Sequence, residues 1–131
     1  MILGGVALVL TVALIYYDLR YYRLPDWVTL PAAAAAAVAC VAHPAGLVGF
    51  AWPAAYLVPA GGIGGGDIKL AVPLGVACAL AAGLIGVLLA AAAASAISLV
   101  AALAARKDRV AHGPAMLAAA WVVVLYGTWQ P

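Results

Sequence analysis

The polar residues of this chain gather in a few short clusters, and long apolar runs separate the clusters. The apolar runs cover residues 2–17, 27–43, 46–60, 68–82, 84–105 and 114–130. Each run holds about 15 to 22 residues, against about 20 for a helix that crosses a hydrocarbon core of about 30 Å. The pattern therefore predicts six helices, several of them short for a membrane span.

One boundary between runs follows from length alone. From Leu70 to Arg106 the sequence is almost continuously apolar, and a single helix of this length would reach about 54 Å and exceed the bilayer. We expect the chain to fold back at Gly83 or Gly86, because glycine relaxes the backbone. The run 46–60 is the least regular of the six, since prolines interrupt it.

Composition places the protein in a membrane. Hydrophobic residues make up 69% of the chain, charged residues 8%, and the mean hydropathy is +1.20. A soluble domain of 131 residues cannot cover its surface with so few polar groups. We therefore expect an all-α, polytopic membrane protein, in which residues 1–131 form a single domain, a bundle of about six transmembrane helices.

The basic residues predict how the chain lies in the membrane. All six lie in three clusters, residues 18–26, 67–69 and 106–109, and two expected crossings separate each cluster from the next. The three clusters are then expected on the same side of the membrane. Because this side holds all the basic residues, the positive-inside rule predicts that it is the cytoplasmic side. Both termini are expected on the outer side of a cell inner membrane.

Two aspartates are the candidate catalytic groups. Asp18 ends the first apolar run, and Asp67 follows the glycine-rich segment 61–66, in a chain with four acidic residues. Each has a simple structural interpretation, Asp18 in an interfacial loop and Asp67 as a helix cap. Both aspartates are expected at the same depth on the same face of the membrane, which favours a catalytic pair. Two carboxyl groups that share a proton can activate a water and protonate a substrate. Aspartyl proteolysis requires such a pair.

Three segments extend this pattern. They are Asp18-x-Arg20 followed by Leu24-Pro25, then Gly64-x-Gly66-Asp67-Ile68-Lys69-Leu70, then His112-Gly113-Pro114 before the last run. In this order they resemble the type IV prepilin peptidases, which are GxGD-type membrane aspartyl proteases with a Phe-Gly-Pro signature near the last helix. The resemblance spans essentially the whole chain.

The resemblance implies that Asp18 and Asp67 are the catalytic pair. It also implies a set of supporting or substrate-binding residues: Gly64, Gly66, Lys69, Arg20 and Pro25. For Arg20 and Lys69 a purely topological role stays open. The implied activity is endopeptidase cleavage of the basic leader of a prepilin or pseudopilin at the cytoplasmic membrane face, with the apolar helix left in the bilayer. No metal, organic cofactor or nucleic acid is implied.

The chain also departs from the family pattern. It has no CxxC motif and no methyltransferase domain, so it resembles the short, peptidase-only members associated with Flp or tight-adherence pili. Asp26 stands where many relatives have asparagine, and His112 replaces an aromatic residue. His112 is then either an interfacial histidine or a titratable group that tunes the aspartate pair.

A small proton-coupled transporter or channel subunit is the alternative function, with Asp18 and Asp67 as proton relays. It predicts ionisable residues on both sides of the bilayer, whereas the outer half offers His43 alone. Oligomeric state does not follow from the sequence.

Overall fold

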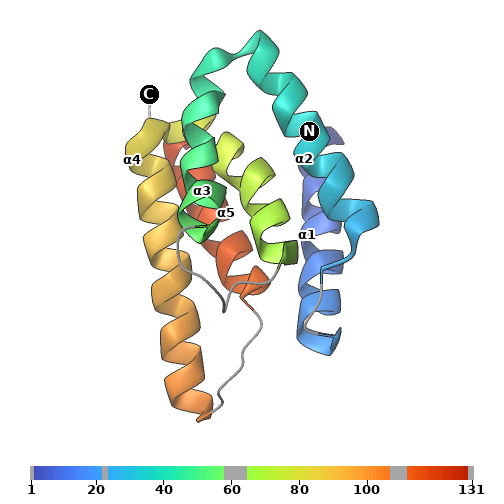
Figure 1. Ribbon diagram of the computed structural model, residues 1–131, viewed down its shortest axis with the longest axis vertical. Coiled ribbons are helices and arrows are strands. Elements are labelled where there is room, and N and C mark those ends of the chain that lie inside the picture. The colour runs from blue at the N-terminus through green and yellow to red at the C-terminus, as the bar shows by residue number, and fades with distance from the viewer. Residues whose placement is uncertain (1, 22–23, 58–64, 107–111, 130–131) are drawn as a thin grey trace.

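The computed structural model describes residues 2–21, 24–57, 65–106 and 112–129, and every element within these ranges is a helix. The elements are α1 (Ile2–Tyr21), α2 (Asp26–Ala42), the 3-10 helix η1 (Pro44–Phe50), α3 (Ala51–Leu57), α4 (Gly65–Ala105) and α5 (Gly113–Trp129). Figure 1 shows them as a bundle in which the two halves of α4 run in opposite directions. The prediction of an all-α fold is confirmed.

The reversal inside α4 occurs at Gly83. This residue has φ 69° and ψ −167°, so the 41-residue element consists of two helices joined at one residue. That backbone conformation is accessible in practice to glycine alone. The prediction of a single fold-back at Gly83 or Gly86 is confirmed for Gly83, whereas Gly86 remains helical.

The described part of the run 46–60, residues 46–57, differs from the single helix that was expected. It begins as the 3-10 helix η1, which Pro44 opens, and continues as the short α3. Pro53 lies in the first turn of α3, where a missing backbone N–H costs little. The change of helix type thus accommodates Pro44 and Pro53 without a kink inside a long α-helix.

The core lies around α4, which contacts α2, η1, α3 and α5, while α1 packs on α5. The largest fully buried side chains come from four of these elements: Thr29 of α2, Trp52 of α3, Leu70, Cys78 and Val87 of α4, and Met116 of α5. Where η1 crosses α4, a Cβ added at Gly49 would overlap the backbone of Gly75. Small residues therefore bring these helices close together, as is common for helices packed in a membrane.

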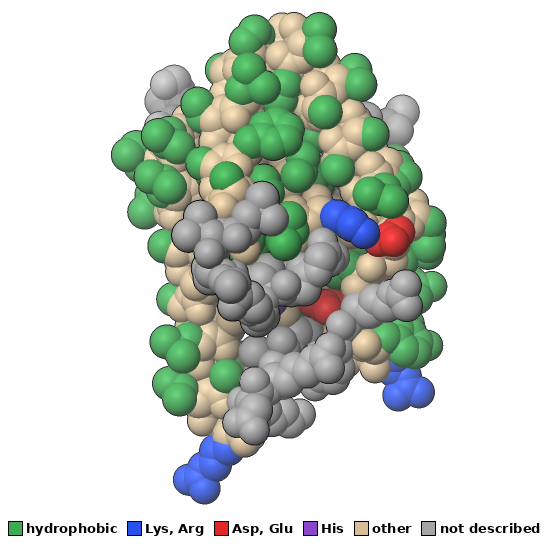
Figure 2. Space-filling view, viewed as in Figure 1, with side chains coloured by type: hydrophobic (Ala, Val, Ile, Leu, Met, Phe, Trp, Pro, Cys, Tyr) green, Lys and Arg blue, Asp and Glu red, His purple; other side chains and the backbone are tan. Residues whose placement is uncertain are grey.

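The outer surface of the bundle is apolar. Val9, Val38 and Leu103 are 68%, 70% and 70% exposed. Among the described residues, Gly4–Tyr21 and Ile68–Ala105 are long and apolar enough to cross a membrane, and Asp26–Ala42 and Gly113–Trp129 are shorter apolar helices. On the face shown in Figure 2, hydrophobic side chains cover the top, and charged side chains lie toward the middle and bottom. This distribution suits a membrane protein with one polar end.

Candidate active site

Asp18 lies in the last turn of α1 and is buried, with 5% of its surface exposed. Its Oδ2 accepts a hydrogen bond of 2.6 Å from the backbone N–H of Gly113. Gly113 is the first residue of α5, where N–H groups have no partner within the helix and the helix dipole is positive. The site therefore places a carboxylate at a position that stabilises negative charge.

Glycine is required at position 113 because of this contact. A Cβ added to Gly113 would overlap the Asp18 carboxylate and lie 3.3 Å from the side chain of Leu24. Leu24 is itself buried, directly before the start of α2. The carboxylate can thus reach the N-terminus of α5 because no side chain intervenes.

His112 precedes Gly113 and is held by two hydroxyl groups. The Tyr56 hydroxyl lies 2.6 Å from its Nε2, and the Ser98 Oγ lies 2.5 Å from its Nδ1. Burial lowers the pKa of His112 below its ordinary value of 6.5. A neutral imidazole has one donor and one acceptor nitrogen, and a hydroxyl can pair with either. The neutral ring is therefore satisfied at both nitrogens.

The start of α4 is linked to the start of α2 by an ion pair. Lys69 Nζ lies 2.8 Å from Asp26 Oδ1, and the two side chains are 37% and 52% exposed. Next to this pair, Pro25 precedes α2, and its carbonyl accepts the N–H groups of Val28 and Thr29 at 3.1 Å. Such an exposed pair contributes at most about 1 kcal/mol, so it orients the helix ends more than it stabilises the fold.

Four helix ends thus meet at the polar end of the bundle. Asp18 joins the end of α1 to the start of α5, and Lys69 joins the start of α4 to the start of α2. The rings of Tyr17 and Trp27, 6.2 Å apart, join α1 to α2. Asp18 and Lys69 belong to two of the charged clusters that the sequence predicts on one face. The structure places both at this end of the bundle.

The structure describes the other predicted site residues to different extents. Arg20 is exposed near the end of α1. Gly66 and Asp67 lie in the first turn of α4. Gly64 and the side chain of Asp67 lie outside the described residues. The predicted pairing of Asp18 with Asp67 therefore stays a prediction.

The model of the type IV leader peptidase family matches residues 5–99. The chain belongs to this family. No curated protein and no solved structure matches it. The matched range contains Asp18 and Asp67 and ends before α5. Family membership together with the apolar helices identifies the chain as a protease of the membrane, as the sequence motifs predict.

Sequence reasoning missed two polar residues of this leader peptidase. Tyr56 and Ser98 lie within apolar runs, and neither belongs to a motif. Their position in the sequence gives a weak signal, since a hydroxyl group in an otherwise apolar membrane helix needs a partner. That His112 is the shared partner follows from tertiary packing, which brings α3, α4 and the start of α5 together.

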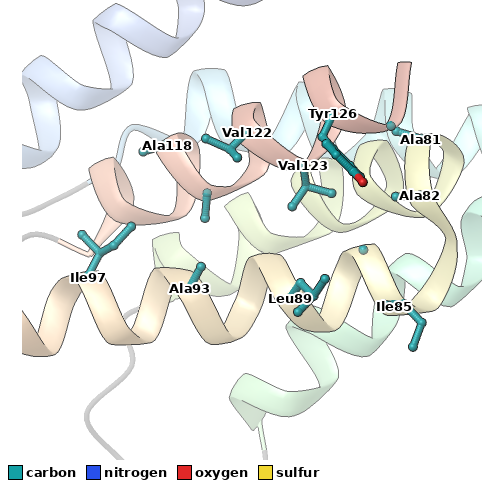
Figure 3. Close-up of a pocket in the computed structure, with 13 residues that line it drawn as sticks. Ala81, Ala82, Ile85, Leu89, Ala93, Ile97, Ala118, Val122, Val123 and Tyr126 are labelled. Atoms are coloured by element: carbon teal, nitrogen blue, oxygen red, sulfur yellow. The ribbon is translucent and has the colours of Figure 1, made fainter. Parts of the chain in front are cut away.

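A groove of about 690 Å³ runs between the second half of α4 and α5 of the leader peptidase. Figure 3 shows side chains of both helices along it, with Ile97 toward one end and Ile85 toward the other. Its lining is apolar apart from the Tyr126 hydroxyl. The groove offers no acid or base, so we assign no chemistry to it.

Proposed function

We propose that the protein is an aspartic endopeptidase that removes the leader peptide of a Flp/Tad-type prepilin. Asp18 and Asp67 form its catalytic pair, at the cytoplasmic face of the cell inner membrane. The observation that carries the proposal is Asp18, a buried carboxylate of a leader peptidase family member, held where four helix ends meet.

The environment of Asp18 favours the role of general base. Its hydrogen bond from Gly113 and the positive end of α5 both stabilise an ionised carboxyl group. Asp67 then carries the shared proton as general acid. Asp18 removes a proton from water as the water oxygen attacks the scissile carbonyl, and Asp67 donates its proton to the carbonyl oxygen. When the intermediate collapses, the C–N bond breaks, the leaving nitrogen takes the proton held by Asp18, Asp67 regains a proton from a hydroxyl group of the intermediate, and a carboxylic acid and an amine result.

The proposed arrangement in the membrane has six spans. They are α1, α2, η1 together with α3, the two halves of α4, and α5. The reversal at Gly83 supports two crossings within α4, and the apolar outer surface supports a lipid environment. With the polar end on the cytoplasmic side, the leader of a prepilin meets Asp18 while its apolar helix stays in the bilayer.

Cleavage of a Flp-type prepilin in membranes tests the proposal. The intact protein, Asp18→Asn, Asp67→Asn and Asp26→Asn are compared at equal membrane levels. We expect the first two substitutions to lower cleavage by about 10²- to 10⁴-fold, the contribution of a general acid or base. Asp26→Asn is the matched control, because Asp26 is an exposed carboxylate at the same end of the bundle.

Two outcomes contradict the proposal. Cleavage that survives either Asp18→Asn or Asp67→Asn shows that the catalytic pair is wrong. If the intact protein cleaves none of the Flp-type prepilins and pseudopilins offered, the leader peptidase function itself is wrong for this chain, and the proton-coupled transporter becomes the better hypothesis.

A further inference from the structure

We infer that His112 is a positioning residue for Asp18. Its ring, held between Tyr56 and Ser98, fixes the first turn of α5 and keeps the Gly113 N–H directed at the Asp18 carboxylate. The inference deepens the proposed function and rests on it for the catalytic importance of Asp18. His112 has no contact with substrate in this role and acts through Gly113.

The first step is the attachment of His112 to the rest of the bundle. The two hydroxyl groups come from different elements, Tyr56 from α3 and Ser98 from the second half of α4. Both distances, 2.6 and 2.5 Å, are those of short hydrogen bonds. The Tyr56 ring also lies against the imidazole, with centroids 5.6 Å apart. A ring held on two sides has little freedom to rotate.

The second step is the connection from His112 to α5. The His112 carbonyl accepts the N–H of Met116 at 3.1 Å, so His112 occupies the N-cap position of α5. The next N–H along the chain is that of Gly113, which binds Asp18. The backbone atom that carries the imidazole ring of His112 is joined to this N–H through a single peptide unit. Movement of His112 therefore moves the donor that holds Asp18.

The third step concerns the polar groups around His112 that the structure describes. Tyr56 faces it from α3, Ser98 from α4, and the Asp18 carboxylate of α1 lies on the far side of Gly113. Tyr56 and Ser98 are neutral groups near neutral pH. The three-residue cluster therefore fixes geometry without adding a charge next to Asp18.

The pH dependence of prepilin cleavage tests the inference. A hydrogen bond from a backbone N–H stabilises an ionised carboxyl group. Loss of this hydrogen bond therefore moves the acidic limb of the profile of cleavage rate against pH to higher pH. For His112→Ala, which removes the ring without restoring the aromatic residue of the family signature, we expect an upward movement of up to about one pH unit, because two or three such hydrogen bonds together account for about two units. Tyr56→Phe and Ser98→Ala each remove one hydroxyl and should move the limb in the same direction, by less.

Thr11→Val is the matched control for these variants. It removes the acceptor of the 3.0 Å hydrogen bond from Trp121, which also joins α1 to α5 but lies two turns from Gly113. We expect its acidic limb to coincide with that of the intact protein. An unmoved limb in His112→Ala and in both hydroxyl variants overturns the inference, even if their rates fall at every pH. An equal movement in Thr11→Val overturns it too.

Amide hydrogen exchange supplies a readout that needs no cleavage. In His112→Ala, exchange should rise at the amides of Gly113 and Ala115, since Pro114 between them has no N–H, and should stay unchanged elsewhere in the described helices. Unchanged exchange at these residues, or a rise throughout α5, overturns the inference. If the intact protein cleaves no prepilin, the proposed function fails while the exchange experiment still decides whether His112 holds the first turn of α5.

Discussion

A buried carboxylate such as Asp18 is costly unless its surroundings replace the lost water. The effective penalty for burying an uncompensated ion is several kcal/mol. Part of the compensation at Asp18 comes from the charge-assisted hydrogen bond of Gly113 and from the positive end of α5. The same groups that make burial tolerable also keep the carboxylate ready to accept a proton from water. Stability and proposed catalysis therefore depend on one contact.

Gly113→Ala should break this contact. The added methyl group overlaps the Asp18 carboxylate, so either the side chain or the start of α5 must shift. We expect cleavage to fall about 10- to 100-fold, because a hydrogen bond to a charged group contributes about 1.5–3 kcal/mol. Gly5→Ala is the control, since a Cβ at Gly5 meets nothing within 4 Å. Parent-like cleavage by Gly113→Ala contradicts the geometry described for Asp18.

His112 should make the folded protein sensitive to mild acid. Its pKa is 6.5 in the unfolded chain and is lowered by burial in the folded one. Above this value the ring is neutral in both states. As the pH falls below it, the unfolded chain takes up the proton first, so stability is lost until the pH passes the folded-state pKa.

Thermal unfolding in detergent at pH 7.5 and pH 5 measures this loss. We expect the unfolding midpoint to drop toward pH 5, and to drop less in His112→Phe. His43→Phe removes an exposed histidine and serves as the control. Equal drops in the intact protein and in His112→Phe would show that burial of His112 does not contribute to the acid sensitivity.

At the scale of the elements, α4 decides the architecture, because its two halves provide most of the packing partners of the bundle. The reversal at Gly83 depends on backbone conformation alone, since a Cβ there would meet nothing within 4 Å. Its φ and ψ values lie in a region that other residues avoid. The cost of a side chain at this position is therefore purely conformational.

Gly83→Ala should destabilise the folded protein by about 1–3 kcal/mol, the cost of holding alanine in a glycine conformation. Equilibrium unfolding in detergent micelles measures the change in the free energy of unfolding. Gly4→Ala, on the exposed face of α1, is the control and should leave stability unchanged or raise it by up to about 1 kcal/mol. A neutral Gly83→Ala would mean that α4 reverses through another backbone geometry.

The sequence predicted the elements better than it predicted the polar contacts between them. The lengths of the apolar runs were enough to predict α1, α2, α5 and the division of α4, because a helix that crosses a membrane needs a certain number of apolar residues. The 3-10 helix η1 was missed, since proline content signals irregularity without specifying its form. Tyr56, Ser98 and His112 are distant in the sequence, so their contact depends on packing that no local pattern encodes.

At the scale of the whole molecule, the distribution of charge predicts a topology. Single cysteines at Arg106 and at His43, in a background where Cys40 and Cys78 are replaced by alanine, should react with impermeant reagents from opposite sides of the membrane. Arg106 and His43 are both exposed, and each follows the end of a helix. We expect Arg106→Cys to react from the cytoplasmic side and His43→Cys from the outer side.

Labelling of both cysteines from the same side would contradict the six-span arrangement. Because Cys40 and Cys78 are buried, alanine should fill their places with a small loss of packing, and retained prepilin cleavage in the cysteine-free background is the necessary control.

The single-residue reversal at Gly83 also bears on how the protein enters the bilayer. Between Lys69 and Arg106 the chain has no charged residue, and the two halves of α4 are joined without a loop. In the proposed six-span arrangement, insertion of this segment carries no charge across the hydrocarbon core, where a charged side chain is costly. In the proposed arrangement we therefore expect the two halves of α4 to enter the bilayer as one hairpin, without export of a hydrophilic loop.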